Sequence, residues 1–205
     1  MQIVTFNKNI YDENAYLLIS EDKHAMVIDP GLNGKDLIDY IDKNGLTLDK
    51  IVLTHGHGDH ITDVELLTSK YASPLYAGEG DKNLLYNADV KVKNMFNLKR
   101  EKITDFAFLS EKDEIIFANH TFHVMNTPGH TKGGLCIYDD KVIFTGDTLF
   151  KGSIGRTDLE GGDYNEIIES LKKISNLNPD LIVYSGHGES STIGYEIMYN
   201  PFLKF

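Results

Sequence analysis

The sequence predicts an α+β fold in which helices cover β-sheets, within a single domain spanning residues 1–205. Short apolar runs rich in Val, Ile, Tyr and Phe recur between turn residues, which is typical of half-buried strands. Between some of these runs, apolar residues recur at spacings of three and four, which indicates amphipathic helices. A chain of 205 residues forms one domain more often than two, and no repeat or low-complexity linker divides it.

The expected strands extend over most of the chain. In order they are Ala15–Ile19, Ala25–Asp29, Ile51–Thr54, Leu75–Ala77, Glu114–Ala118, Thr121–Asn126, Leu135–Tyr138, Val142–Thr145 and Leu181–Tyr184. Asp139 and Asp140 separate two of them and predict a hairpin turn, because Asp tolerates turn geometry.

Four stretches show helical spacing. The first surrounds Leu37 and Ile41, and the third and fourth cover Asn165–Ile174 and Thr192–Tyr199. The second is predicted as one helix, whose apolar face would comprise Ile61, Val64, Leu67 and Tyr71. The segment Asn87–Arg100 has little apolar periodicity, so we expect a surface excursion there.

Composition excludes several classes of protein. The net charge of −11, from 31 acidic and 20 basic residues, argues against a nucleic-acid binder, because such proteins neutralise phosphates. The single cysteine, Cys136, excludes an internal disulfide framework and is expected to be buried within its apolar run. Neither an export signal nor a long apolar span is visible, so we expect a cytoplasmic protein without a membrane segment, acting on a small molecule. The oligomeric state stays open.

The densest chemical signal follows the expected strand that begins at Ile51. The run Thr54–His60 (THGHGDH) contains three histidines and one aspartate. His55 and His57 are two residues apart, so in extended backbone they point to the same side. Asp59 and His60 lie at the start of the next expected helix and face a neighbouring point. This spacing predicts metal ligands rather than a solvated polar loop.

Three later strands end in the same way, with a ligand-type residue beside glycine. They place His130, Asp147 and His187 in loops at strand ends. Together with the first motif they supply five histidines and two aspartates, which suits two divalent ions that share a ligand. Imidazole and carboxylate are compatible with zinc, which is the metal we expect, and iron or manganese can use the same set. The remaining histidines, His24, His120 and His123, are expected on the surface or in packing contacts.

The combined pattern resembles the metallo-β-lactamase superfamily, from near residue 15 to residue 194. The resemblance implies an αββα four-layer sandwich with the metals at one edge of the two sheets. It also implies that a first metal is held by His55, His57 and His130, and a second by Asp59, His60 and His187, with Asp147 shared by both.

Within that superfamily the chain is similar to the short glyoxalase II-like (hydroxyacylglutathione hydrolase-like) group, over Phe144–Phe150, Gly152–Asp158 and Gly186–Gly194. Two other branches of the superfamily match this sequence less well. Secreted zinc β-lactamases have a cysteine ligand near the position of Asp147, and flavodiiron reductases have glutamate at the position of His57. Few residues follow His187, so no separate C-terminal glutathione-binding helical domain is expected.

Arg156 stands out because only one other arginine, Arg100, occurs among the basic residues. Its planar head with several donors suits a clamp on a substrate carboxylate. Pairing with Asp158, which would brace the loop, is an equal alternative.

The resemblance to the glyoxalase II-like group implies a binuclear metal-dependent hydrolase of a small acyl thioester similar to S-lactoylglutathione. A hydroxide bridging two ions roughly 3.5–4 Å apart would attack the carbonyl carbon. Asp59 would be the catalytic residue that orients this hydroxide and receives its proton. No other cofactor is expected.

Two other functions compete with this one. A persulfide dioxygenase of the same superfamily would use the same motifs with one iron and oxygen. A non-enzymatic binding module would require a site that has lost its activity, yet every expected metal-ligand position still carries a histidine or an aspartate. A serine hydrolase is disfavoured because no carboxylate, histidine and serine order exists outside the metal motifs.

Overall fold

The computed structural model describes residues 1–87 and 105–205. The expected excursion Asn87–Arg100 lies outside the described residues, except for Asn87 itself, which ends a short helix.

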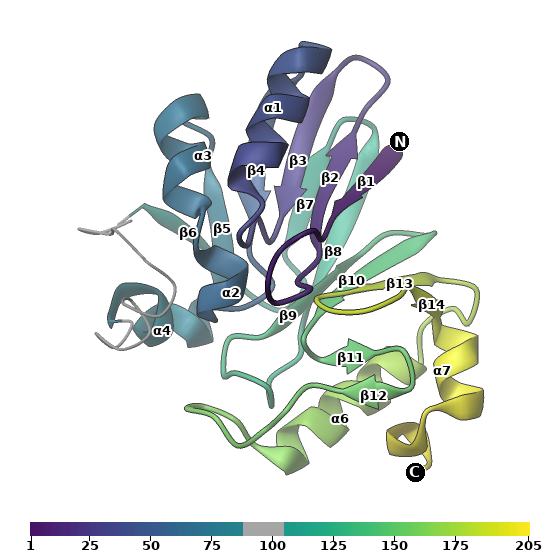
Figure 1. The fold of residues 1–205 in the computed structure, drawn as a ribbon. Helices are drawn as coiled ribbons and strands as arrows, with labels where there is room; N and C mark the ends of the chain where they lie inside the picture. Colours follow the sequence, from purple (N-terminus) through teal and green to yellow (C-terminus); the bar gives the residue numbers. More distant parts are fainter. Residues whose placement is uncertain (88–104) are drawn as a thin grey trace.

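The N-terminal half forms a six-stranded sheet with its strands in chain order (Figure 1). Its first two pairings are antiparallel and the next three are parallel. The strands are β1 (Gln2–Phe6), β2 (Ala15–Ile19), β3 (His24–Ile28), β4 (Thr47–Val52), β5 (Leu75–Gly78) and β6 (Phe106–Leu109).

The C-terminal half forms a second six-stranded sheet, in the order β14, β13, β10, β9, β8, β7. Strands β13 and β10 pair in parallel, and the other neighbours are antiparallel. The strands are β7 (Glu114–Phe117), β8 (His120–Asn126), β9 (Leu135–Tyr138), β10 (Val142–Gly146), β13 (Ile182–Ser185) and β14 (Ser191–Thr192). A separate hairpin pairs β11 (Leu149–Phe150) with β12 (Ser153–Ile154).

Helices cover the outer face of each sheet (Figure 1). α1 (Gly34–Asn44) and α3 (Val64–Tyr71) lie on the first sheet, and α6 (Tyr164–Ser175) and α7 (Ile193–Tyr199) lie on the second. The shorter helices are α2 (Gly58–Ile61), η1 (Glu79–Asp81), α4 (Lys82–Asn87) and η2 (Pro201–Leu203). The expected αββα sandwich is therefore confirmed.

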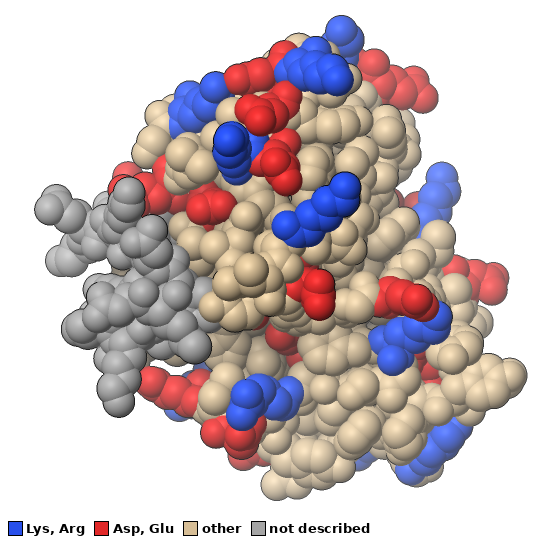
Figure 2. Space-filling model, in the orientation of Figure 1, with Lys and Arg blue, Asp and Glu red and all other residues tan. Residues whose placement is uncertain are grey.

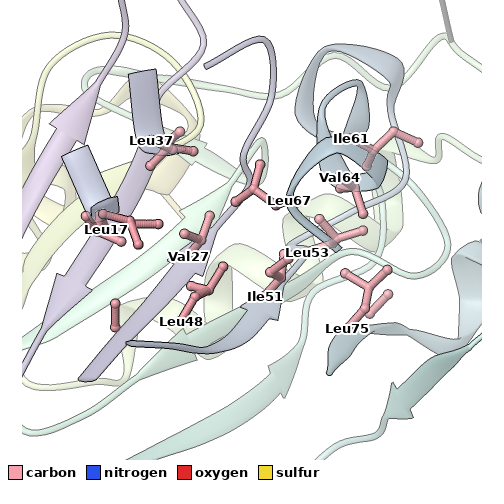
Figure 3. Close-up of a cluster of buried hydrophobic side chains, with 14 of the residues drawn as sticks. Leu17, Val27, Leu37, Leu48, Ile51, Leu53, Ile61, Val64, Leu67 and Leu75 are labelled. Atoms are coloured by element: carbon pink, nitrogen blue, oxygen red, sulfur yellow. The ribbon is translucent and has the colours of Figure 1, made fainter. Parts of the chain in front are cut away.

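Three apolar layers hold the four structural layers together. The first joins α1 and α3 to the first sheet through residues such as Leu37 and Ile51, which are fully buried (Figure 3). The second lies between the sheets and includes Phe122 and Phe144. The third joins the second sheet to α6 and α7 and contains buried Cys136. Burial of apolar surface on both faces of each sheet supplies the rigid scaffold for the loops at its edge.

All nine predicted strands occur, with ends shifted by a few residues, and the hairpin turn at Asp139 is confirmed. The Asp139 side chain accepts hydrogen bonds from the backbone N–H groups of Lys141 and Val142, at 2.8 and 2.9 Å. Strands β1, β6, β11, β12 and β14 were not predicted. They are short or lie at sheet edges, so neighbouring strands contribute much of their stability.

The single helix predicted through Ile61 and Tyr71 is wrong, because α2 ends at Ile61 and α3 begins at Val64. Asp63 separates them: its N–H donates to the carbonyl of Gly31 at 2.8 Å, and its carboxylate accepts from the N–H of Gly34 at 2.9 Å. These tertiary contacts replace the hydrogen bonds that would have continued one helix.

On the face shown in Figure 2, acidic and basic side chains are interspersed and no broad basic surface is visible. Within residues 1–87 and 105–205, no helix is both long and apolar enough to cross a bilayer.

Candidate metal centre

The seven predicted ligands come from four loops that meet at one edge of the sandwich. The first loop follows β4 and runs into α2, and the others follow β8, β10 and β13. In Figure 1 α2 and the loops after β10 and β13 meet near the centre of the view, beside the N-terminal loop between β1 and β2. Residues far apart in the sequence are thus brought to one place.

His55, His57 and His130 form the first ligand group. One ligand atom from each lies within 4.8 Å of the others. The Nδ1 atom of His57 faces the Nε2 atom of His130 at 2.8 Å. His55 is only 2% exposed, so the group is mostly closed to solvent.

Asp59, His60 and His187 form the second ligand group, again with ligand atoms within 4.8 Å of one another. The Nε2 atoms of His60 and His187 are 3.4 Å apart, and that of His187 is 3.4 Å from a carboxylate oxygen of Asp59. The side chains of Asp59 and His187 are 21% and 27% exposed. This group forms the more open side of the centre.

Asp147 lies between the two groups. One carboxylate oxygen is 3.3 Å from Nε2 of His60, and the other is 3.5 Å from Nε2 of both His130 and His187. The carboxylate therefore faces members of both groups. The structure thus assembles the seven residues in the arrangement that the resemblance implies, while their binding of metal stays a prediction.

Hydrogen bonds orient four of the histidines so that Nδ1 points outward and Nε2 points into the centre. The Nδ1 atoms of His60, His130 and His187 donate to Asp29 Oδ2, the Arg156 carbonyl and the Tyr11 carbonyl, at 3.0, 2.7 and 3.1 Å. The Nδ1 atom of His55 donates to the hydroxyl of Thr54 at 3.1 Å. Such partners set the tautomer that leaves Nε2 free to bind a metal.

The donor set fits divalent cations. His55 Nε2 and Asp147 Oδ1 are buried without a hydrogen-bond partner among the described residues. Buried polar atoms are rarely left unpaired, because losing contact with water without replacement is unfavourable. Both atoms face the ligand groups, and imidazole with carboxylate is a set that zinc, iron and manganese all accept.

Two members of the first group, His55 and His57, are neutral imidazoles at neutral pH. Burial, together with repulsion from other imidazoles of the centre, lowers the pKa of His55 well below its usual value. The same causes lower the pKa of His57 to about 4. Neither residue needs to lose a proton before it can bind a cation.

The second group carries charge. Burial opposes the charged form of His60, but the nearby carboxylates of Asp147 and Asp29 outweigh it and raise the His60 pKa. Burial also opposes the charge of His187, and hydrogen bonding to Asp59 more than compensates, so its pKa is raised. The pKa of Asp59 is lowered despite burial, mainly through His187 and His60. Without metal, the Asp59 carboxylate and the imidazoles of His60 and His187 therefore stabilise one another's charged forms.

Glycine permits the close approach of the loops after β10 and β13. Gly146 has φ of +48°, and a Cβ atom there would meet the side chain of Thr54. A Cβ atom on Gly186 would meet the Asp147 carboxylate. The glycines beside Asp147 and His187 therefore let the ligand loops pack together.

Sequence reasoning missed Asp29 as part of the site. It is 1% exposed and directly follows β3, and one of its oxygens accepts from the N–H of Thr54 at 2.7 Å. The other accepts from the Thr54 hydroxyl and from His60. Asp29 stands at a strand end and is followed by Pro30 and Gly31, a pattern similar to that of Asp147 beside Gly146, so the sequence did contain a signal.

The N-terminal loop was also missed, and it supports His187. The backbones of Glu13 and His187 form an isolated β-bridge, and the N–H of Asn14 donates to the Gly186 carbonyl at 2.8 Å. The Glu13 carboxyl is fully buried, and burial raises its pKa to about 9. No periodicity in this loop marks these contacts, because they depend on chain segments far apart in sequence.

Arg156 lies in the loop after β12, next to the first ligand group through its backbone carbonyl. Its side chain forms two hydrogen bonds with the Asp158 carboxylate, both 2.7 Å long. Both side chains are more than half exposed. The loop-bracing pair is thus present, and a substrate contact stays a prediction.

The other three histidines lie outside the ligand groups, as predicted. His24, His120 and His123 each lie beside one acidic residue, namely Asp49, Asp139 and Glu114. Cys136 is fully buried, and burial raises its pKa to about 12, which argues against a nucleophilic role.

Two helix-covered sheets with histidine and aspartate loops at their shared edge are typical of the metallo-hydrolases. The chain belongs to the metallo-beta-lactamase superfamily, whose family model matches residues 10–187. It is 34% identical to the hydroxyacylglutathione hydrolase GloC of Haemophilus influenzae, over 100% of this chain and 99% of that protein.

Two solved structures are also similar. The BLEG-1 B3 metallo-beta-lactamase shares 35% identity with a TM-score of 0.91, and the alignment covers 100% of both chains. TTHA1623 in a di-iron-bound form shares 33% identity with a TM-score of 0.87, covering 98% of this chain and 100% of that one. The structural relatives thus include a di-iron form, so the fold alone does not select zinc.

Proposed function

We propose that this protein is a binuclear metal-dependent thioesterase that hydrolyses a small acyl thioester of the S-lactoylglutathione type. The observation that carries the proposal is the presence of two complete ligand groups with Asp147 between them. The full-length similarity to a hydroxyacylglutathione hydrolase supports the substrate class.

Seven residues of the chain would bind the two cations. His55, His57 and His130 would hold one cation, the second ligand group would hold another, and Asp147 would contact both. When bound, two divalent cations supply Lewis acidity and lower the pKa of a coordinated water.

Asp59 has the position and charge for the proton-handling role. It is partly exposed, and its lowered pKa keeps the carboxylate ionised at neutral pH. An ionised carboxylate orients the attacking water by accepting its hydrogen bond, and then receives its proton. His187, beside it, maintains that charge state through the contact at 3.4 Å.

Zinc is the cation we propose, in two copies per chain, with iron or manganese as substitutes that the same ligands accept. Arg156 is proposed to contact a carboxylate of the substrate, which would require it to exchange its partner Asp158. We further propose that the protein acts in the cytoplasm on a small molecule, without a nucleic-acid or membrane partner.

The test is elemental analysis of protein purified without added metal, followed by assays on thioesters, a persulfide and a β-lactam. We expect close to two metal ions per chain and hydrolysis of thioesters in preference to the β-lactam. Reloading the chelated protein with zinc, iron or manganese in parallel identifies the metal that restores most activity.

A persulfide dioxygenase is the main alternative. One iron per chain, with oxygen consumption on the persulfide and no thioester hydrolysis, would establish that function instead. Bound metal without turnover of any substrate would indicate a binding module.

A further inference from the structure

Asp81 connects the two loops that carry the first ligand group. It ends η1 and is 1% exposed, and its carboxylate accepts three hydrogen bonds from residues outside its own helix. Its Oδ2 atom accepts from the N–H of Gly56, between His55 and His57, at 2.8 Å. The same oxygen accepts from the hydroxyl of Thr131, next to His130, at 2.8 Å.

A third hydrogen bond secures the second loop. The Oδ1 atom of Asp81 accepts from the N–H of Gly133 at 2.6 Å. A Cβ atom on Gly78 would meet the carbonyl oxygen of Gly133, so glycine allows the two backbones to lie in contact. One buried carboxylate thus holds both ligand loops with three donors.

We propose that Asp81 is a positioning residue for the first ligand group: its buried carboxylate holds the loop of His55 and His57 against the loop of His130. The facing ring nitrogens of His57 and His130, 2.8 Å apart, depend on the relative placement of these two loops. Asp81 touches neither imidazole, so it acts through the backbone.

This role mirrors that of Asp29 in the second group. Asp29 accepts directly from the ring of His60, whereas Asp81 reaches the ligands only through backbone and hydroxyl donors. Asp29 also accepts from Thr54, which contacts His55, so it reaches both groups, whereas the hydrogen bonds of Asp81 go to the two loops of the first group. Partners of this kind commonly change metal affinity by about 10- to 100-fold when they are removed.

Asp81→Asn is the most informative variant because it is nearly isosteric. The asparagine has one acceptor oxygen and one donor nitrogen, while all three partners of Asp81 are donors. With the oxygen toward Gly56 and Thr131, the amide nitrogen opposes the N–H of Gly133. In the flipped amide, the nitrogen opposes the N–H of Gly56 instead, and the Thr131 hydroxyl must rotate to accept. Neither orientation keeps all three hydrogen bonds, and each places an N–H of the amide against a backbone N–H of one ligand loop.

The experiment measures zinc retention against a competing chelator, without any substrate. We expect Asp81→Asn to weaken zinc binding by about 10-fold or more, and Thr131→Val, which removes one bond, to weaken it less. In nitrogen-15 spectra of the zinc-loaded protein, imidazole signals of His57 and His130 should shift, whereas that of His187 should not.

Asp139→Asn is the matched control. Asp139 is 7% exposed and accepts two backbone N–H groups at the β9–β10 turn, at the opposite end of β10 from Asp147. The Asp139→Asn variant should have a lower melting temperature than the unmodified protein but the same zinc retention. The proposal is overturned if Asp81→Asn behaves like this control, or if the two variants reduce zinc retention equally. Because no turnover is measured, failure of the thioesterase assignment would not affect this result.

Discussion

The two ligand groups differ in the solvent exposure of their side chains and in the charge of their residues. The side chain of His130 in the first group is 5% exposed, whereas that of His187 in the second is 27% exposed. The first group contains only imidazoles, two of which have lowered pKa values, and the second combines a carboxylate with imidazoles of raised pKa. We infer that the first group is preformed for a cation, whereas the second must release protons and rearrange charge.

Asp147→Ala removes the residue that faces both groups, so it should have the largest effect. We expect loss of detectable activity together with reduced metal content, because both groups lose a carboxylate ligand. Elemental analysis and a thioester assay measure the two effects.

His120→Ala and His123→Ala are the controls for that variant, because both lie outside the ligand groups, and metal content should not change. Normal metal stoichiometry and turnover in Asp147→Ala would exclude the shared-ligand arrangement.

Chelation should distinguish the groups by their exposure. The metal of the second group should leave first, and complete removal should give an inactive but folded protein. Loss of ligands that bind only the native state lowers the melting temperature, here by about 5–10 °C for a site saturated about 100-fold above its Kd. Scanning calorimetry during a chelator titration measures both steps. Unfolding at room temperature would show that the metals are structural too.

Metal affinity should depend on pH at the second group more than at the first. Raised pKa values mean that His60 and His187 hold protons at higher pH than usual, and a cation must displace them. Affinity should therefore rise with pH through this range, by up to about tenfold per pH unit for each proton released. Zinc titrations from pH 6 to 8 test this, and equal pH dependence at both groups would contradict the comparison.

The same shifts act in the opposite direction on the metal-free protein. Protonated His60 is paired with Asp29 and Asp147, so its stabilising contribution is fully present below the unfolded pKa of about 6.5. It is lost as pH rises through the raised folded pKa. Chemical denaturation of the apoprotein at pH 6 and 8 should show this decline, and metal-loaded protein should not.

Arg156→Lys should have the smallest effect. It keeps the charge but loses the two-pronged geometry that Arg156 now shows toward Asp158. We expect KM to rise about tenfold, or about 1.4 kcal/mol, for thioesters with a carboxylate, with little change in kcat. Steady-state kinetics on thioesters with and without a carboxylate provide the measurement. Equal losses on both substrates, with normal metal content, would mean that Arg156 only braces its loop.

The local pattern of apolar residues in the sequence was enough to predict most of the strands and helices. Short apolar runs between turn residues predicted the strands that lie inside the sheets, and spacings of three and four predicted the helices α1, α6 and α7, because the burial of these elements requires apolar residues in those patterns. The run from His55 to His60 likewise contains two of the three residues of each ligand group.

Only the tertiary structure shows which interactions connect the strands, helices and ligand loops. The break between α2 and α3 at Asp63, and the supporting roles of Asp29, Asp81 and the Tyr11 carbonyl, depend on hydrogen bonds between segments distant in sequence. A single buried carboxylate produces no periodic pattern in the sequence. Its structural role depends on which hydrogen-bond donors the packing of the chain places around it. Sequence therefore determined which residues could bind a cation, and the packing of the two sheets determined which of them face one another.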